Sequence, residues 1–234
     1  MVNPKIIMTK RLIITEEEKN DIKSLYNISE QTDGYSQFLT GLMDVALSSN
    51  VNGSSGGAST QGVSAKGQAL LDNPIFKKKL TEISAAIGID EDSIIKLMNH
   101  ESFLDSSSKN SIGCVGLIQF CPTRPGGTTK IINGKTYNLE DIRNNLETQM
   151  DVIKEFWVSA KATYPINSPI DLYIYNFVPI AVGKNNDFVL EWSGRSAETV
   201  AKSNPVFNTT LGRPIETPLT VGDLERYYRK KGMI

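Results

Sequence analysis

Helical signals follow one another closely from about residue 69 to the end of the chain, and they constrain the fold more than any other feature. Apolar residues recur three and four positions apart, as they do on one face of a helix. Asn73-Pro74 and Ser168-Pro169 each join a capping side chain to a proline that suits the first turn of a helix. The pattern predicts a mainly α domain built from successive amphipathic helices.

One hairpin signal interrupts these helices. Asn133-Gly134 lies between β-forming residues in the segment IINGKTY, which is typical of a tight type I′ turn between two short strands. The expected helices are 74–87, a helix capped by Asp90 or Asp92 that ends near Ser102, 139–162, 170–177, and helices that follow Ser196 and Thr220. The fold class is therefore mainly α with one small β-hairpin.

The first part of the chain differs in composition. Residues 1–48 contain two amphipathic stretches, 15–28 and 35–47, and form an N-terminal helical arm that is too small to fold well alone. Residues 49–68 are rich in Gly and Ser, as flexible linkers are. We expect a docking arm (1–48), a linker (49–68) and a main domain with a C-terminal helical extension (69–234).

The overall composition narrows the function classes. The formal net charge is -1, from 25 Lys and Arg against 26 Asp and Glu, so no strong field attracts nucleic acid or an anionic membrane. Lys5, Lys10 and Arg11 interrupt the N-terminal sequence before the apolar stretch of a signal peptide, and no later apolar run has the length of a membrane span. We expect no nucleic-acid partner, no membrane span and no signal peptide.

Residues that bind metals are scarce. The chain has one histidine, His100, and two cysteines, Cys114 and Cys121, which is too few for the usual zinc sites. The segment 203–228 faintly resembles the end of a calcium loop, but residues 208–210 are Asn, Thr and Thr where such a loop needs carboxylates. We expect no metal and no cofactor.

Glu101 is the candidate catalytic residue. It comes at the carboxyl end of an apolar helix, where partial loss of water raises the pKa of a carboxyl group towards that of a useful general acid. An isolated glutamate at a helix end is more often solvated, so the residues that follow Glu101 decide whether it is a catalytic candidate. Glu101-Ser102 is followed by an apolar stretch that contains Gly113, Gly116 and Gln119, in which glycine lets backbone approach a ligand and glutamine offers paired donor and acceptor groups.

These residues resemble a known family. Glu101-Ser102, then 113–119, then Tyr175-Asn176, are similar to three ordered motifs of lytic transglycosylases with the goose-type lysozyme fold, and the resemblance covers about residues 74–190. Such enzymes cut the β-1,4 bond between N-acetylmuramic acid and N-acetylglucosamine in peptidoglycan. The third motif departs from the family pattern, since 177–179 are Phe, Val and Pro where small residues are usual. Either Tyr173 or Tyr175 is then the tyrosine that faces the acid.

The resemblance implies a role for each matching residue. Glu101 would protonate the glycosidic oxygen and then deprotonate the C6 hydroxyl of the sugar, which attacks C1 and closes a 1,6-anhydro ring. Tyr175 and Asn176 would orient Glu101 and hold the acetamido group, and the remaining predicted substrate-binding residues are Ser102, Gly116, Gln119 and Tyr173.

The carboxylates near Glu101 favour this intramolecular route over hydrolysis. Ordinary glycosidases use two carboxylates. Between Glu101 and Glu140 the only other carboxylate is Asp105, although the fold can bring Asp171 or Asp187 into reach. A hydrolytic lysozyme activity remains the alternative.

The two cysteines are expected to have a structural role and no catalytic one. Cys114 and Cys121 are not in a C-x-x-C pattern, and we expect free thiols that fill apolar space. A Cys-His peptidase with His100 as the base is disfavoured, because His100 would point about 100° away from its helix neighbour Glu101.

The arm also resembles, with low specificity, an N-terminal arm of bacteriophage proteins. The resemblance implies a phage particle in which residues 1–48 dock on tail or baseplate proteins while the tethered domain opens the host periplasmic wall. The alternatives are a hydrolytic endolysin and a structural or glycan-binding virion protein that keeps a lysozyme-like fold without turnover.

Overall fold

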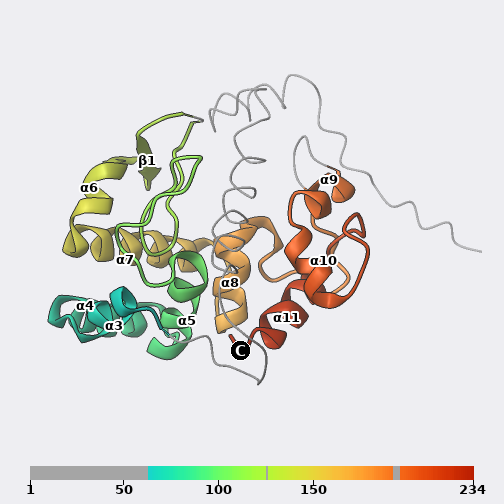
Figure 1. The fold of residues 1–234 in the computed structure, drawn as a ribbon, viewed down its shortest axis with the longest axis horizontal. Coiled ribbons are helices and arrows are strands. Elements are labelled where there is room, and N and C mark those ends of the chain that lie inside the picture. The colour runs from blue at the N-terminus through green and yellow to red at the C-terminus, as the bar shows by residue number, and fades with distance from the viewer. Residues whose placement is uncertain (1–62, 125, 192–195) are drawn as a thin grey trace, which may run out of the picture. The chain divides into compact units, whose positions relative to one another are not determined.

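The computed structural model describes residues 63–124, 126–191 and 196–234, which are mainly helical with one small antiparallel sheet (Figure 1). The elements in chain order are α3 (Ala65–Asp72), α4 (Pro74–Ile87), α5 (Glu91–Ser102), β1 (Thr129–Ile132), β2 (Lys135–Asn138), α6 (Leu139–Asn144), α7 (Leu146–Thr163), α8 (Pro169–Phe177), η1 (Pro179–Ala181), α9 (Ala197–Lys202), α10 (Pro205–Leu211) and α11 (Val221–Lys230). The predicted fold class is confirmed for this part of the chain. The predicted arm, with its two helices, and most of the predicted linker lie outside the described residues.

The predicted linker extends too far. Helix α3 begins at Ala65, within the range 49–68 that the sequence assigns to the linker. The Ser64 side chain caps this helix by accepting a hydrogen bond from the Gly67 backbone N–H at 3.0 Å. Gly67 itself packs closely, since a Cβ atom there would lie 3.2 Å from Cβ of Leu104. A cap and a tertiary contact thus make residues 65–68 helical despite their linker-like composition.

Capping side chains begin the helices where the sequence predicts. Asn73 Oδ1 accepts hydrogen bonds from the first backbone N–H groups of α4, and Asp90, one of the two candidates, caps α5. Ser168 and Asp171 form a reciprocal capping box at the start of α8. Local sequence chemistry alone therefore fixes where these helices begin.

The predicted helix over 139–162 is two helices. Asn145 leaves the helical conformation, with φ of -131°, and its side chain accepts a hydrogen bond from the Thr148 backbone N–H at 2.9 Å. Asparagine competes for backbone hydrogen bonds in this way and favours caps over helix interiors. The chain therefore turns between α6 and α7, although the apolar pattern runs through the turn.

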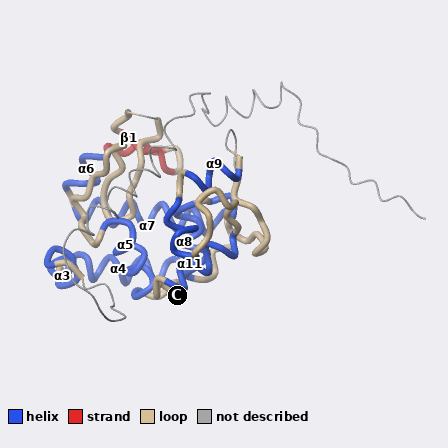
Figure 2. The backbone as a smooth tube through the Cα atoms, turned by 45° about the vertical axis from the view of Figure 1, so that its right-hand side comes forward, coloured by secondary structure: helices blue, strands red, loops and turns tan. Residues whose placement is uncertain are grey.

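The hairpin is confirmed. Strands β1 and β2 pair antiparallel, with Ile132 opposite Lys135. Asn133 and Gly134 have φ angles of 51° and 75°, so both adopt the left-handed conformation that a type I′ turn requires. Figure 2 shows this hairpin as the only strand pair drawn in the described part of the chain.

Helix α8 lies between two groups of helices (Figures 1 and 2). On one side α4 packs along α7, and α5 contacts α8; on the other side α11 packs on α8 and on α10. Apolar side chains from both groups form one buried cluster, which includes Leu97, Trp157, Leu172 and Leu224. This packing places the carboxyl end of α5 beside α8, where the site lies.

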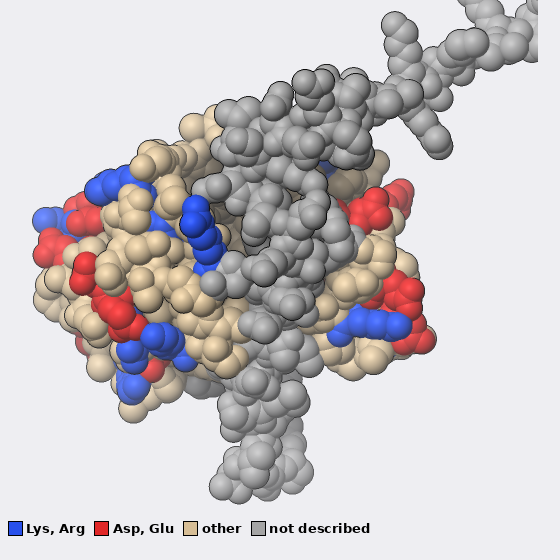
Figure 3. All heavy atoms as spheres, turned by 90° about the horizontal axis from the view of Figure 1, so that it is seen from above, with Lys and Arg blue, Asp and Glu red and all other residues tan. Residues whose placement is uncertain are grey.

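The part of the surface that Figure 3 shows for the described residues carries both Lys and Arg and Asp and Glu, and neither sign of charge dominates there. Among the described residues, no helix is both long and apolar enough to cross a membrane.

Candidate active site

Glu101 is half-buried in the last turn of α5. It lies four positions after Leu97 and three after Met98, which are both fully buried, so it shares an edge of the face that packs into the core. Asn176, from α8, donates a hydrogen bond from Nδ2 to Glu101 Oε1 at 3.1 Å. This hydrogen bond agrees with the prediction that Asn176 orients Glu101, whereas the predicted contacts of Asn176 and Tyr175 with substrate stay predictions.

Burial raises the pKa of Glu101 from its ordinary value of 4.5 to about 7, and the hydrogen bond from Asn176 opposes part of this rise. A donated N–H stabilises the carboxylate, so the two effects have opposite signs. No charged neighbour among the described residues contributes to the shift. A carboxyl group with this pKa exchanges a proton readily near neutral pH, as a general acid and base must.

The backbone around Glu101 is strained. Phe103 and Leu104, which directly follow α5, have φ angles of 55° and 58°, and Gln119 in the following loop has φ of 54°. Non-glycine residues adopt this left-handed conformation at a cost, and such strain gathers at functional sites. The strained turn redirects the chain from the end of α5 into the loop that packs against it.

Ser102 connects α5 to that loop. Its side chain is buried, and its hydroxyl oxygen lies 3.0 Å from the Met98 carbonyl and 3.2 Å from the Leu117 carbonyl. A hydroxyl between these two acceptors holds the loop against the helix end. Ser102 therefore fixes the backbone next to Glu101, and its position gives no support to the predicted contact with substrate.

Gln149 is a site-supporting residue that the sequence analysis missed. It is fully buried on α7; its Oε1 accepts from the Leu117 backbone N–H at 2.8 Å, and its Nε2 donates to the carbonyls of Ser106 and Ile142. Its signal in the sequence is a polar residue at core spacing, three after Leu146.

Gly116 is needed for Gln149. A Cβ atom at Gly116 would lie 2.7 Å from Gln149 Nε2, and the φ of Gly116 is +77°. Gly116 is buried, so its lack of a side chain admits the Gln149 amide into the loop. The close approach that Gly116 permits in this structure is to Gln149, and its predicted contact with substrate stays a prediction.

Gln119 is also used inside the loop. It is 5% exposed, and its Nε2 donates to the Gly116 carbonyl at 2.9 Å and lies 3.3 Å from the Ser108 hydroxyl. These bonds engage the amide N–H groups that were predicted to meet an amide-bearing substrate. In this structure Gln119 shapes the loop.

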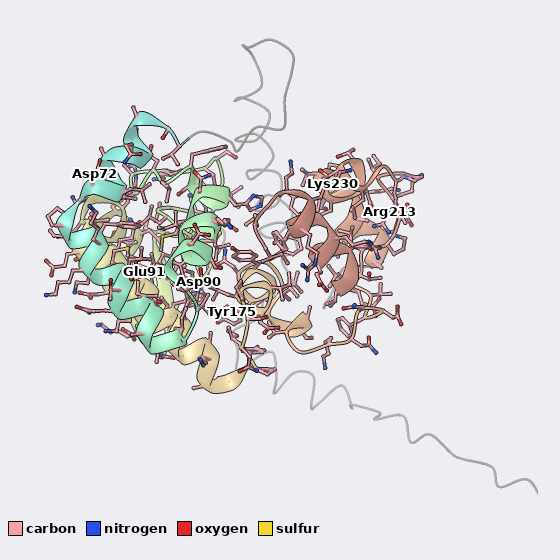
Figure 4. The ribbon with its side chains drawn as sticks, turned by 90° about the horizontal axis from the view of Figure 1, so that it is seen from below. Asp72, Asp90, Glu91, Tyr175, Arg213 and Lys230 are labelled. Atoms are coloured by element: carbon pink, nitrogen blue, oxygen red, sulfur yellow. A yellow bond between two sulfur atoms is a disulfide. The ribbon has the colours of Figure 1, made fainter. Side chains whose placement is uncertain are left out.

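The two tyrosines that the sequence left open lie in different places. Tyr173 is fully buried, and its hydroxyl lies 2.8 Å from the Ser93 carbonyl and 3.2 Å from the Met233 carbonyl, so its predicted contact with substrate is not supported. Tyr175 is 9% exposed, and its ring packs against those of Phe156 and Tyr164, each with a centroid separation of 5.3 Å. Figure 4 shows Tyr175 on the central helix α8.

The cysteines are not free thiols. Cys114 and Cys121, the two cysteines of the chain, form a disulfide, with Cα atoms 3.9 Å apart. Val115 pairs antiparallel with Phe120, which brings the flanking positions 114 and 121 opposite each other. The expectation failed because this loop pairing leaves no local sequence signature. A Cys-His peptidase is excluded in this state, since neither sulfur is available as a nucleophile.

The C-terminal extension also reaches the end of α5. Tyr227 and Tyr228 of α11 lie with ring centroids 5.9 Å and 6.0 Å from the ring of His100. Burial raises the pKa of both hydroxyls, and the nearby Glu101 raises it further. These tyrosines belong to the surroundings of the acid, which the sequence motifs do not reveal.

Within the described ranges, no group of three or more His, Cys, Asp or Glu side chains is arranged to hold a metal ion.

Comparison with known proteins gives a match that covers the part of the chain that contains Glu101 and Asn176. Residues 80–186 match the family model described as "Transglycosylase SLT domain", which supports the lytic transglycosylase and lysozyme-like family for this part of the chain and peptidoglycan as its substrate. No curated protein and no solved structure matches the chain.

Proposed function

We propose that this chain cleaves the β-1,4 bond between N-acetylmuramic acid and N-acetylglucosamine in peptidoglycan, with Glu101 as the single acid and base. The observation that carries the proposal is the half-buried carboxyl group at the end of α5, whose pKa is raised by burial to about 7 and which accepts a hydrogen bond from Asn176. Near neutral pH a large fraction of such carboxyl groups still holds the proton that the reaction needs.

The proposed reaction moves one proton through Glu101 and consumes no water. The protonated carboxyl group donates its proton to the glycosidic oxygen as the bond from that oxygen to C1 breaks. The carboxylate then accepts the proton of the C6 hydroxyl of the same muramic acid residue, whose oxygen forms the new bond to C1. Glu101 ends protonated, and the products are a free 4-hydroxyl group and a 1,6-anhydro sugar.

The other acidic candidates support a single-carboxylate route. Asp105 pairs with Lys66 at 2.8 Å, and Asp171 accepts hydrogen bonds at the start of α8. Asp187 is exposed. A second carboxylate 5 to 5.5 Å away, as in retaining glycosidases, would raise the pKa of Glu101 by charge repulsion. Among the described residues, no such contribution acts on Glu101.

Asn176 is suited to two tasks in this reaction. Its Nδ2 already donates to Glu101 and holds one carboxyl oxygen in place. Its Oδ1 has no hydrogen bond to another described residue, so it is able to accept the N–H of a substrate acetamido group. The ring of Tyr175, from the same helix, would flank the sugar.

The test is cleavage of purified peptidoglycan by the full chain and by Glu101→Gln, with Glu216→Gln as a control at an exposed glutamate. General acid catalysis contributes about 10² to 10⁴-fold, so clearing by Glu101→Gln should fall by that factor while the control retains activity. Equal clearing by all three proteins, or none by any, contradicts the proposal and favours a structural or glycan-binding protein.

The mass of the released muropeptides decides between the two cleavage chemistries. Products lighter by one water than the hydrolytic products mark the 1,6-anhydro route. Reducing ends at muramic acid mark hydrolysis, the activity of a lysozyme-type endolysin, and would contradict the intramolecular step.

We further propose that the enzyme acts from a phage particle on the host periplasmic wall, with residues 1–48 docked on tail or baseplate proteins. The support is the sequence of residues 1–48 and the Gly/Ser-rich stretch that follows, both outside the described residues. Immunodetection in purified particles, with the full chain and a variant that lacks 1–48, tests this. Absence from particles and accumulation in the infected cell would favour an endolysin.

A further inference from the structure

Lys130 points to the inner side of the hairpin. Side chains alternate between the two faces of a strand. Along β1, Lys130 is half-buried, Ile131 is exposed and Ile132 is buried. Lys130 therefore shares the face on which Ile132 enters the core. Its cross-strand neighbour is Tyr137. A lysine in this position keeps its ammonium group close to the body of the domain.

No carboxylate among the described residues pairs with Lys130. Its pKa is lowered by burial, and no charged neighbour adds to or opposes this shift. Lys135, on the other strand of the same hairpin, differs: it is exposed, and the Tyr137 hydroxyl and Glu155 raise its pKa. A half-buried cation without an anionic partner loses hydration that a nearby aromatic ring compensates only in part. This arrangement favours binding of an anion that the described residues do not supply.

Aromatic rings connect Lys130 to the site. Its Nζ lies 6.0 Å from the ring centroid of Phe156, and the Phe156 ring lies 5.3 Å from that of Tyr175. Tyr175 precedes Asn176, which donates to Glu101. Phe156 is half-buried, so part of its ring remains available to solvent. A sugar chain that runs from Glu101 across these rings would bring its substituents towards the hairpin.

We propose that Lys130 is a specificity-determining residue whose ammonium group binds a carboxylate carried by the muramic acid residue of the glycan strand. This inference rests on the proposed function, because it concerns the substrate of the same site. The carboxylate comes from one of two sources. It belongs to the stem peptide where the peptide is attached, or to the lactyl group where the peptide has been removed. N-Acetylglucosamine residues carry neither group.

The experiment compares the full chain with Lys130→Gln, Lys130→Arg and Lys135→Gln on three glycans. These are peptide-bearing glycan strands, strands from which an amidase has removed the peptides, and oligomers of N-acetylglucosamine alone. Steady-state cleavage gives KM and kcat. In parallel, the Glu101→Gln form of each protein is titrated with the same glycans, so that binding is measured without turnover.

A charge-assisted hydrogen bond is worth about tenfold or more in affinity. We expect Lys130→Gln to raise KM, and the dissociation constant of its Glu101→Gln form, by about tenfold on a carboxylate-bearing glycan with kcat little changed. Lys130→Arg should retain most of the affinity, and Lys135→Gln should match the unsubstituted protein. Oligomers of N-acetylglucosamine should show no difference. An effect on peptide-bearing strands alone identifies the stem peptide, and an effect on the stripped strands identifies the lactyl group.

Equal effects of Lys130→Gln on all three glycans, or no effect on any, overturn the inference while cleavage by the unsubstituted protein leaves the proposed function standing. Conversely, if no protein cleaves any glycan, the proposed function fails. The titrations of the Glu101→Gln forms then still decide whether Lys130 binds a carboxylate of the glycan.

Discussion

Two carboxyl groups in this molecule are buried, but their pKa values shift in opposite directions. Glu101 lies in the last turn of α5, has one amide partner, and its pKa is raised by burial to about 7. Asp223 lies in the first turn of α11 with a side chain only 1% exposed, and burial would raise its pKa too. However, hydrogen bonds from Arg213 and the Thr220 backbone, with the charges of Arg213 and Arg226, hold that pKa below its ordinary value.

The position of each carboxyl group on its helix favours the direction in which its pKa is shifted. The amino end of a helix stabilises a negative charge and the carboxyl end disfavours it. Asp223 therefore has a helix end, a capping box and two guanidinium groups in its favour, whereas Glu101 has only Asn176. Burial raises the pKa of a carboxyl group to a value useful for catalysis only where no Lys or Arg side chain lies close enough to lower it again. The C-terminal group of helices uses its buried carboxylate for stability, and the site around α5 keeps its carboxyl group able to exchange a proton.

Asp223→Asn should produce the largest change in stability. The substitution removes the negative charge that pairs with Arg213, at 2.8 Å, and with Arg226. Loss of one partner of a buried ion pair is expected to lower the free energy of unfolding by about 2 to 4 kcal/mol at pH 7. Urea denaturation at pH 7 measures this, and an unchanged midpoint would remove the contrast with Glu101.

The pH dependence of the same variant provides its control. The folded-state pKa of Asp223 lies below its value in the unfolded chain, so its contribution is present above the unfolded pKa and disappears as the pH falls through the folded one. The two proteins should therefore approach the same stability in strong acid.

Glu101→Gln should stabilise the protein, and only at higher pH. Glu101 releases its proton near 4.5 in the unfolded chain and near 7 in the folded protein, so between these values the unfolded chain holds fewer protons and stability falls as the pH rises. Glutamine removes this loss. The expected gain in the free energy of unfolding is about 1 to 3 kcal/mol at pH 8 and close to zero at pH 4.

Denaturation of both proteins at pH 4 and pH 8 checks this. The same gain at both values would assign it to packing rather than to titration, and a loss at pH 8 would contradict the raised pKa.

Asn176→Ala should shift the pH dependence of cleavage. The Asn176 amide lowers the pKa of Glu101 against the effect of burial, so its removal should raise that pKa further, by about half a unit to one unit. The alkaline side of the profile of kcat against pH should move upwards by the same amount, with a lower maximum. Asn144→Ala, at an exposed residue of α6, is the control. A downward shift would show that the amide does not stabilise the carboxylate.

Arg226→Gln should have the smallest effect. Arg226 pairs with the same carboxylate as Arg213, but its side chain is 62% exposed against 27% for Arg213. Exposed ion pairs contribute at most about 1 kcal/mol, so the variant should lower the free energy of unfolding by less than that. Arg213→Gln, measured beside it, should cost more, because Arg213 also donates to Asn208. Equal effects would mean that exposure does not separate the two cations.

The sequence predicts correctly those features that depend on neighbours within a few residues. The helix starts after Asn73 and Ser168 follow from caps that bond three positions ahead, and the hairpin follows from Asn133-Gly134. The pattern of Leu97 and Met98 also places Glu101 at the edge of a buried helix face. These are local relations, and the chain carries them wherever it folds.

Contacts between distant segments decided the rest. Only the packing of α7 against the loop shows that Gly116 and Leu117 serve Gln149, and only the Val115 to Phe120 pairing brings Cys114 to Cys121. The choice between two tyrosines on α8 likewise depended on which one reaches the carbonyl oxygens of Ser93 and Met233. By itself the sequence determined the capped starts of α4, α5 and α8, the hairpin, and the place of the candidate acid on its helix. Tertiary structure decided the partners of that acid, because burial and hydrogen bonding join residues whose separation along the chain carries no periodic signal.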